Sequence, residues 1–172
     1  MAQRKGSPGP EYGTAHVMDC TFRKKLRLEG YDYSSVGAYF VTVCTAERKP
    51  ILCRVGADDH IGPNIRLTEI GKIVDKYTRT IPGVDYYVIM PNHVHLIIFI
   101  PQDGTVWSPS PTRIDTRIRT WKTLITKELG YSLWQRSYYD HIIRNEQDYI
   151  EKAQYILNNP ARWCEDQYYS EH

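Results

Sequence analysis

The stretch from Tyr86 to Ile100 constrains the fold more than any other part of the chain. It contains two apolar runs separated by Met90-Pro91-Asn92, and the second run begins with His93-Val94-His95. Proline and asparagine favour turns, so the pattern predicts two neighbouring strands joined at a turn. The second run is apolar at every position from Leu96 onward, which is typical of a central strand that is covered on both faces.

His93 and His95 are two positions apart, so their side chains point to the same face of the predicted strand, with Cα atoms about 6.7 Å apart. Two neutral imidazoles on one face can bind one divalent cation or contact a phosphate. An incidental pair of polar residues is the alternative interpretation. However, imidazoles at the end of a buried strand destabilise the fold unless they have a partner.

Two other classes of histidine enzyme are excluded because the sequence lacks residues that they need: nucleotide hydrolases with three alternating histidines, and phosphoesterases with two His-x-Thr or His-x-Ser pairs. Ile97 stands where a third alternating histidine would be, and none of the other histidines begins a second His-x-Thr or His-x-Ser pair. A site built on His93 and His95 therefore needs a partner from elsewhere in the chain.

The composition narrows the class of protein. A chain of 172 residues with 41% hydrophobic and 24% charged residues is expected to form one globular domain. The net charge of +2 is too small to indicate a nucleic-acid partner, so any basic surface must come from local clustering. The 14 tyrosines include candidates for stacking on bases.

Cysteine spacing and hydropathy indicate a cytoplasmic protein. The four cysteines lack the close pairs of a zinc site, and we find neither a secretory segment nor an apolar run of about 20 residues that could span a membrane. We expect a flexible N-terminal arm over residues 1–20, which are rich in glycine and proline, a single domain over 21–163 and a tail over 164–172.

Periodicity predicts both strands and helices outside the central stretch. In chain order, the predicted elements are a strand over 38–44, a hairpin of 51–55 with 61–67, a helix over 68–80, the strand pair of 86–100, a helix over 113–129 and a helix from Asn145 to Asn159. Thr68 is the expected N-cap of the first helix, and Pro160 is expected to stop the last. This order predicts an α+β fold, a ferredoxin-like antiparallel sheet with helices packed on one face.

Basic residues gather in three places and are candidates for contacts with DNA. They are Arg23, Lys24 and Lys25 before the domain; Arg113, Arg117, Arg119, Lys122 and Lys127 on the helix over 113–129; and His141 with Arg144 in an aromatic segment. A solvated helix face is the ordinary interpretation of such charge. For His141, a structural hydrogen bond beside the last helix is an equal alternative.

Two motifs in this order resemble those of the single-tyrosine HUH transposases, where HUH denotes His, a hydrophobic residue, and His. The first is His93-Val94-His95, and the second extends from Trp134-Gln135 through Asp140–Asn145 to Tyr155–Pro160. The chain most resembles the branch associated with repetitive extragenic palindromes, the REP-associated tyrosine transposases. The resemblance covers most of residues 27–163 and implies an HUH endonuclease-type fold, with the catalytic domain over 21–163.

The resemblance also implies roles for individual residues. Tyr155 corresponds to the nucleophile, and His93 and His95 correspond to ligands of a divalent metal, Mg or Mn. Asn159 stands where the family has a third polar ligand, although related branches have glutamine there. Tyr155 and Asn159 are four residues apart and so share one helix face. Spacing alone also allows Tyr155 to be an amphipathic residue that packs on the sheet.

The implied activity is metal-dependent nicking and strand transfer on single-stranded DNA that carries a hairpin or palindrome, through a 5′-phosphotyrosine intermediate. Two alternatives remain open. One is a non-catalytic protein, derived from a transposase, that binds DNA hairpins or regulates transcription. The other is a metal-dependent nuclease that uses water. The sequence also leaves open whether the protein is a monomer or a homodimer.

Overall fold

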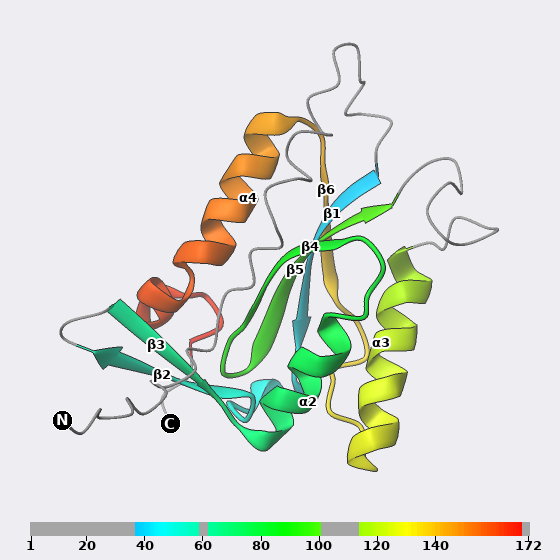
Figure 1. Ribbon diagram of the computed structural model, residues 1–172, viewed down its shortest axis with the longest axis vertical. Helices are drawn as coiled ribbons and strands as arrows, with labels where there is room; N and C mark the ends of the chain where they lie inside the picture. Colours follow the sequence, from blue (N-terminus) through cyan, green and yellow to red (C-terminus); the bar gives the residue numbers. More distant parts are fainter. Residues whose placement is uncertain (1–36, 59–61, 101–113, 170–172) are drawn as a thin grey trace, which may run out of the picture.

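The structure, a computed structural model, describes residues 37–58, 62–100 and 114–169 (Figure 1). Its strands are β1 (Gly37–Cys44), β2 (Cys53–Asp58), β3 (Gly62–Leu67), β4 (Val84–Ile89), β5 (His93–Ile100) and β6 (Tyr139–Ile143). Its α-helices are α2 (Glu69–Thr78), α3 (Ile114–Leu129) and α4 (Glu146–Asn158), and η1 (Ala46–Arg48) and η2 (Pro160–Glu165) are short 3-10 helices.

Four strands form an antiparallel sheet in the order β4-β5-β1-β6, while β2 pairs with β3 in a separate hairpin. The predicted α+β fold is therefore confirmed, and β5 lies inside the sheet as its apolar sequence indicates. Thr68 caps α2 by accepting a hydrogen bond from the Gly71 amide, as expected. The aromatic segment that precedes α4 contributes β6, which forms one edge of the sheet.

Helices cover both faces of the sheet, so the expectation of helices on one face was wrong for the last helix. In Figure 1, α2 and α3 lie on one side of the sheet and α4 on the other. The physical reason is the composition of β5, whose alternate residues Leu96 and Ile98 face one core while Ile97 and Phe99 face a second. Both apolar faces need a covering layer.

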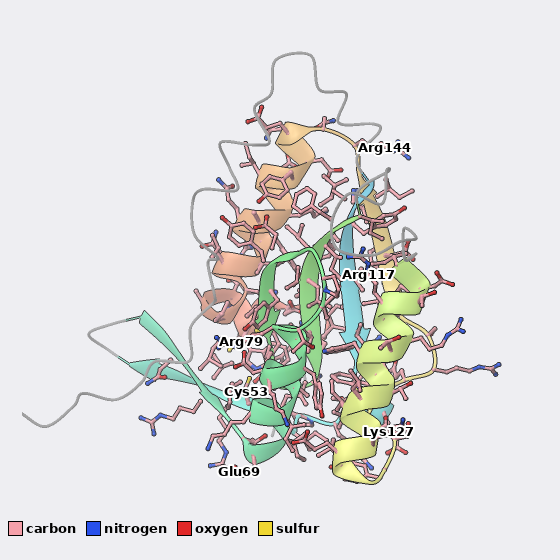
Figure 2. All side chains as sticks on the ribbon, turned by 45° about the vertical axis from the view of Figure 1, so that its right-hand side comes forward. Cys53, Glu69, Arg79, Arg117, Lys127 and Arg144 are labelled. Carbon is pink, nitrogen blue, oxygen red and sulfur yellow. The ribbon has the colours of Figure 1, made fainter. Side chains whose placement is uncertain are left out.

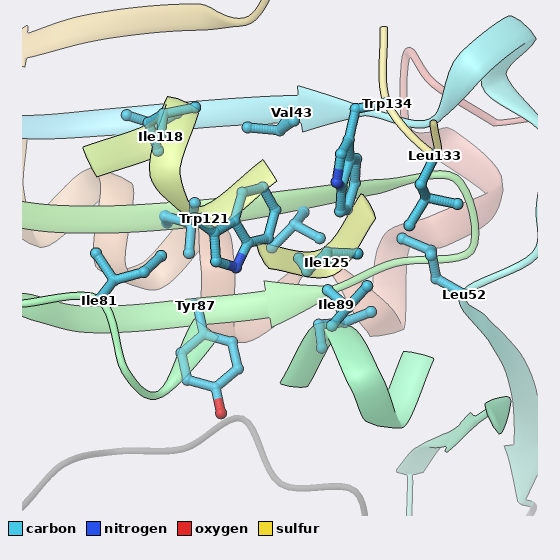
Figure 3. Close-up of a cluster of buried hydrophobic side chains, with 14 of the residues drawn as sticks. Val43, Leu52, Ile81, Tyr87, Ile89, Ile118, Trp121, Ile125, Leu133 and Trp134 are labelled. Carbon is cyan, nitrogen blue, oxygen red and sulfur yellow. The ribbon is translucent and has the colours of Figure 1, made fainter. Parts of the chain in front are cut away.

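The core beneath α2 and α3 is dominated by large side chains (Figure 3). Trp121 and Ile125 of α3 are fully buried against Leu96 and Ile98 of the sheet. On the opposite face, Ala153 and Ile156 of α4 and Trp163 of η2 pack on Phe40 and Ile97. No helix in the described ranges is long and apolar enough to span a bilayer.

We expect Gly71→Ala to destabilise the fold, although alanine is the better helix former by about 1 kcal/mol. A Cβ at Gly71 would overlap the carbonyl oxygen of Leu52. That oxygen accepts hydrogen bonds from the amide and hydroxyl of Thr68 and cannot move away without losing them. Overpacking of this kind costs about 1–3 kcal/mol.

Denaturant unfolding of Gly71→Ala measures this loss of stability. Lys72→Ala, at the neighbouring exposed position, is the control and is expected to change stability by about 0.5 kcal/mol or less. If Gly71→Ala were as stable as the wild type, the close approach of α2 to Leu52 would be wrong.

Candidate metal and tyrosine site

The side chains of His93 and His95 meet on one face of β5, as their spacing predicts. Both residues are buried, and their Nε2 atoms are 3.0 Å apart. The Phe40 ring, from the neighbouring strand β1, stacks on His95 with 5.2 Å between ring centroids. The Nε2 atoms of the two imidazoles are therefore close enough to bind the same ion.

The outer nitrogen of each histidine has its own hydrogen-bond partner. His93 Nδ1 is 2.8 Å from Asn92 Oδ1, and the Asn92 amide is oriented because its Nδ2 donates to the carbonyl of Tyr168. Since an amide oxygen only accepts, His93 carries its proton on Nδ1 and has a lone pair on Nε2. His95 Nδ1 is 2.8 Å from Thr42 Oγ1, a hydroxyl that can either donate or accept.

Both imidazoles are neutral at physiological pH. Burial, helped by the positive charge of Arg48, lowers the pKa of His93 to about 3. Burial and the neighbouring His93 hold the pKa of His95 well below its ordinary value, although Asp166 acts in the opposite direction. Neutral imidazole is the form that binds metal ions.

Tyr155 and Asn159 bring α4 to this pair. The Tyr155 ring lies edge-on to His95, with centroids 5.1 Å apart, and the residue is 39% exposed. Asn159 is the C-cap of α4 and is buried, and its Oδ1 atom has no hydrogen-bond partner among the residues that the structure describes. The structure thus gathers Tyr155, Asn159, His93 and His95, four residues that the sequence singles out.

Asp166 is the site residue that sequence reasoning missed. Its Oδ2 accepts hydrogen bonds from the Tyr155 hydroxyl (3.1 Å) and from Asn159 Nδ2 (2.8 Å), and its Oδ1 accepts from the Tyr168 amide. One ligand atom each from His93, His95 and Asp166 lie within 4.8 Å of one another. Asp166 belongs to the segment interpreted as a tail, where one carboxylate among polar residues has no informative spacing.

These side chains fit a divalent metal ion. They offer two imidazole nitrogens, the Asp166 carboxylate and the Oδ1 atom of Asn159, which no other described residue hydrogen-bonds. Adjacent ligands of an octahedral ion that binds at about 2.1 Å are about 3.0 Å apart, and the two Nε2 atoms have that separation. Mixed nitrogen and oxygen ligands are compatible with several divalent ions.

Thr42→Val tests the partner of His95. A metal ligand at Nε2 requires the His95 proton on Nδ1, where the Thr42 hydroxyl accepts it. Valine has nearly the same shape but no acceptor, so we expect Mn²⁺ affinity to fall about 10- to 100-fold in calorimetric titration. Thr42→Ser keeps the hydroxyl and is expected to bind like the wild type. Equal affinity of the valine variant would contradict this role.

Tyr155 is protonated at physiological pH. Burial, together with the negative charge and hydrogen bond of Asp166, raises the pKa of Tyr155 to about 12. A neutral phenol is a weak nucleophile, so an attack by Tyr155 needs a group that accepts its proton or a cation that offsets the developing charge.

We expect Asp166→Asn to lower the pKa of Tyr155 toward its ordinary value and to weaken Mn²⁺ binding about tenfold or more. Tyrosine NMR titration and calorimetry measure the two effects. Glu165→Gln is the matched control, because Glu165 is an exposed neighbouring acid that pairs with Arg162. Unchanged values for both quantities in Asp166→Asn would remove Asp166 from the site.

A cavity of about 820 Å³ opens beside Tyr155. Strands β1 and β6, helix α4 and the segment after η2 form its walls, through residues that include Phe40, Thr42, Tyr139, Lys152, Tyr155 and Tyr168.

Arg48 lies near this end of the sheet, with its guanidinium carbon 5.1 Å from the centre of the Tyr168 ring. Arg48 and Glu47 have positive φ angles of 53° and 54°, a conformation that costs energy for residues with a Cβ.

Several of the basic residues have partners within the protein. The Arg117 guanidinium donates to the carbonyls of Pro82 and Phe99, and Lys122 Nζ donates to the carbonyls of Gln135 and Ser137. Burial lowers the pKa of both side chains. These contacts give Arg117 and Lys122 structural roles that the sequence did not reveal.

The remaining candidates for DNA contact are more varied. His141 Nε2 hydrogen-bonds the Asp148 carboxylate beside α4, which is the structural alternative considered for it. Arg119 is exposed, with Asp115 3.9 Å away. Figure 2 shows Lys127 near the end of α3 and Arg144 between β6 and α4. Arg23, Lys24, Lys25, Arg113 and the arm over 1–20 lie outside the described residues.

Comparisons with known proteins give three informative similarities, while no protein-family model matches. An uncharacterized protein of Haemophilus influenzae is 33% identical over 177 residues, covering 86% of this chain and 93% of that protein. The REP-associated tyrosine transposase of Escherichia coli K12 is 30% identical over 80 residues, covering 46% of this chain and 44% of the transposase.

The third similarity is structural. The structure of a REP-associated tyrosine transposase bound to a REP hairpin matches with a TM-score of 0.51 and 24% identity, covering 77% of this chain and 71% of the other. At this level of identity, the match establishes a common fold.

Proposed function

The chain belongs to the family of REP-associated tyrosine transposases, and from this premise we propose that it nicks and rejoins single-stranded DNA through a 5′-phosphotyrosine intermediate. The substrate is DNA that carries a hairpin or palindrome. The reaction depends on a divalent metal ion, Mg²⁺ or Mn²⁺, bound by His93, His95 and Asp166, with Asn159 as a further oxygen ligand.

One observation carries the proposal: the Tyr155 hydroxyl lies beside two neutral imidazoles whose Nε2 atoms converge. The Tyr155 ring is 5.1 Å from that of His95, and its hydroxyl is bound to a carboxylate that also lies near both imidazoles. A nuclease that uses water has no need of a tyrosine at this position.

The residues divide the chemistry between them. The Tyr155 oxygen forms a bond to phosphorus while the bond from phosphorus to the 3′ oxygen breaks. The departing 3′ oxygen takes up a proton from solvent, which leaves a 5′-phosphotyrosine and a free 3′-hydroxyl. Asp166 Oδ2, which already accepts the Tyr155 hydrogen bond, is positioned to receive the phenolic proton. When bound, a divalent ion polarises the phosphate and offsets the charge that develops on its oxygens.

The reaction that forms the phosphotyrosine replaces one phosphodiester bond with another. A 3′-hydroxyl can therefore attack the phosphotyrosine and reverse the reaction. This property supports strand transfer in place of simple hydrolysis. We propose a single-stranded or unpaired segment as the substrate because aromatic side chains line the cavity beside Tyr155, and the bases of a single strand are free to stack on such rings.

Basic side chains are proposed to hold the flanking DNA, and their contacts with phosphates would make binding sensitive to salt. The proposed set is Arg23, Lys24, Lys25, Arg113, Arg119, Lys127 and Arg144. Arg117, Lys122 and His141, which the sequence also offered, are left out because their side chains bind other groups of the protein. The relative of known structure was bound to a REP hairpin, which supports a hairpin as the recognised element.

The test is a denaturing-gel assay for a covalent protein–DNA adduct, with pools of single-stranded hairpin DNA and Mn²⁺ or Mg²⁺. We expect an adduct whose DNA-linked peptide contains Tyr155, and we expect a chelator to abolish it. Cutting without an adduct would favour the water-using nuclease. Hairpin binding with neither cutting nor adduct would favour a non-catalytic DNA-binding protein.

A further inference from the structure

Tyr139 occupies an unusual position for an aromatic residue. It is the first residue of the edge strand β6, lies directly opposite Thr42 of the neighbouring strand β1, and is 58% exposed. Directly paired residues lie on the same face of a sheet, so Tyr139 is on the face where Thr42 contacts His95. Its ring lines the cavity beside Tyr155 without being buried in the core.

Lys152 reaches the same cavity from α4. It lies three residues before Tyr155 on the helix, and its Nζ is 5.6 Å from the centre of the Phe40 ring. Phe40 in turn contacts both His95 and Tyr155, with ring centroids 5.2 and 5.9 Å away. The Lys152 ammonium group therefore lies beside an aromatic ring that contacts both His95 and Tyr155.

The cavity also has acidic residues, but each is engaged with a neighbour. Glu151 accepts a hydrogen bond from Gln147, Glu165 pairs with Arg162, and Asp166 accepts from Tyr155. Lys152 makes no ion pair within 4 Å among the described residues. It is thus the cation of this cavity that remains available to a ligand.

We propose that the cavity binds one nucleotide of single-stranded DNA next to the bond that is cut, with its base stacked on Tyr139 and its phosphate on Lys152. This inference rests on the proposed function and identifies where the strand lies. An exposed aromatic ring beside a cation is the pairing by which proteins bind single strands with little sequence preference. The volume of about 820 Å³ is in the usual range for sites that bind small molecules.

The test is fluorescence anisotropy with two labelled probes in a chelator: the oligonucleotide (dT)8 and a hairpin with the same single-stranded tail. We expect Tyr139→Ala to weaken binding about tenfold or more, because stacking on one aromatic residue contributes on that scale. Tyr139→Phe keeps the ring and is expected to bind within about twofold of the wild type. Tyr131→Ala, an exposed tyrosine outside the cavity, is the matched control.

The role of Lys152 has its own measurement. Lys152→Gln is expected to reduce the slope of log affinity against log salt by about 0.7, the value for one phosphate contact with a single strand. Lys72→Gln, on the exposed side of α2, is expected to leave the slope unchanged.

Three results would overturn the nucleotide site: unchanged binding by Tyr139→Ala, equal losses in Tyr139→Phe and Tyr139→Ala, or no binding of either probe by the wild type. These binding results are independent of whether the adduct assay supports the proposed reaction. An adduct at Tyr155 with binding indifferent to Tyr139 rejects only the nucleotide site. Binding that depends on Tyr139 without any adduct rejects only the reaction.

Discussion

Tyr155→Phe is expected to abolish the covalent attachment of DNA, reducing adduct formation by at least about a thousandfold. Phenylalanine preserves the ring contacts with His95 and Phe40 but has no oxygen to attack phosphorus. The folded protein loses the hydrogen bond to Asp166, and a bond of this kind contributes about 1 kcal/mol. DNA affinity is therefore expected to stay within about twofold of the wild type.

Adduct formation on denaturing gels and DNA affinity by anisotropy are measured on the same preparations. Tyr149→Phe is the matched control, because it removes a hydroxyl from the same helix at a residue that contacts Asp85 and Phe99. This control is expected to keep its adduct. Cleavage by Tyr155→Phe at the wild-type rate would assign the nucleophile to another group.

Local sequence patterns sufficed for much of this site. The spacing of His93 and His95 on a strand determines that their side chains share a face, whatever the rest of the fold. The four-residue spacing of Tyr155 and Asn159 does the same on α4. What brings the two pairs together is the packing of α4 on β5 and β1, which spacing within one element cannot show.

The partners of the histidines depend on strand register and on the path of the chain after α4. Thr42 reaches His95 because β1 and β5 pair antiparallel with these residues opposite each other. A polar residue within the apolar run of β1 was the available signal. Asp166 had no comparable signal, because its position follows from the return of the chain beyond η2 toward Tyr155 and Asn159.

Charge patterns were less informative because they do not show what a side chain can reach. Arg117 and Lys122 belong to a basic helix, yet both donate to backbone carbonyls of other segments. Long basic side chains can satisfy buried carbonyls while their aliphatic parts pack on the core. Arg119, Lys127 and Arg144, all exposed, are better placed to meet a phosphate backbone.

Replacing both His93 and His95 with alanine is expected to remove divalent metal binding, a loss of at least about a hundredfold in affinity for Mn²⁺. The two Nε2 atoms are the converging nitrogen donors of the site, and alanine supplies none. Adduct formation is expected to fall with metal binding. Hairpin affinity measured in a chelator is expected to change little, since neither buried imidazole is available to DNA.

Thermal or denaturant unfolding with and without Mn²⁺ separates loss of metal from loss of fold. A ligand at about 100 times its Kd stabilises the native state by about 2.7 kcal/mol, so the wild type is expected to gain this amount. The double variant is expected to gain about 0.4 kcal/mol or less, even if the cavities it leaves lower its stability in chelator. His141→Ala, whose imidazole contacts Asp148 away from the paired nitrogens, is expected to retain the full gain. If Mn²⁺ stabilised the double variant as much as the wild type, the metal would bind at another set of ligands. The attack by Tyr155 would then not be assisted by a metal ion at His93 and His95.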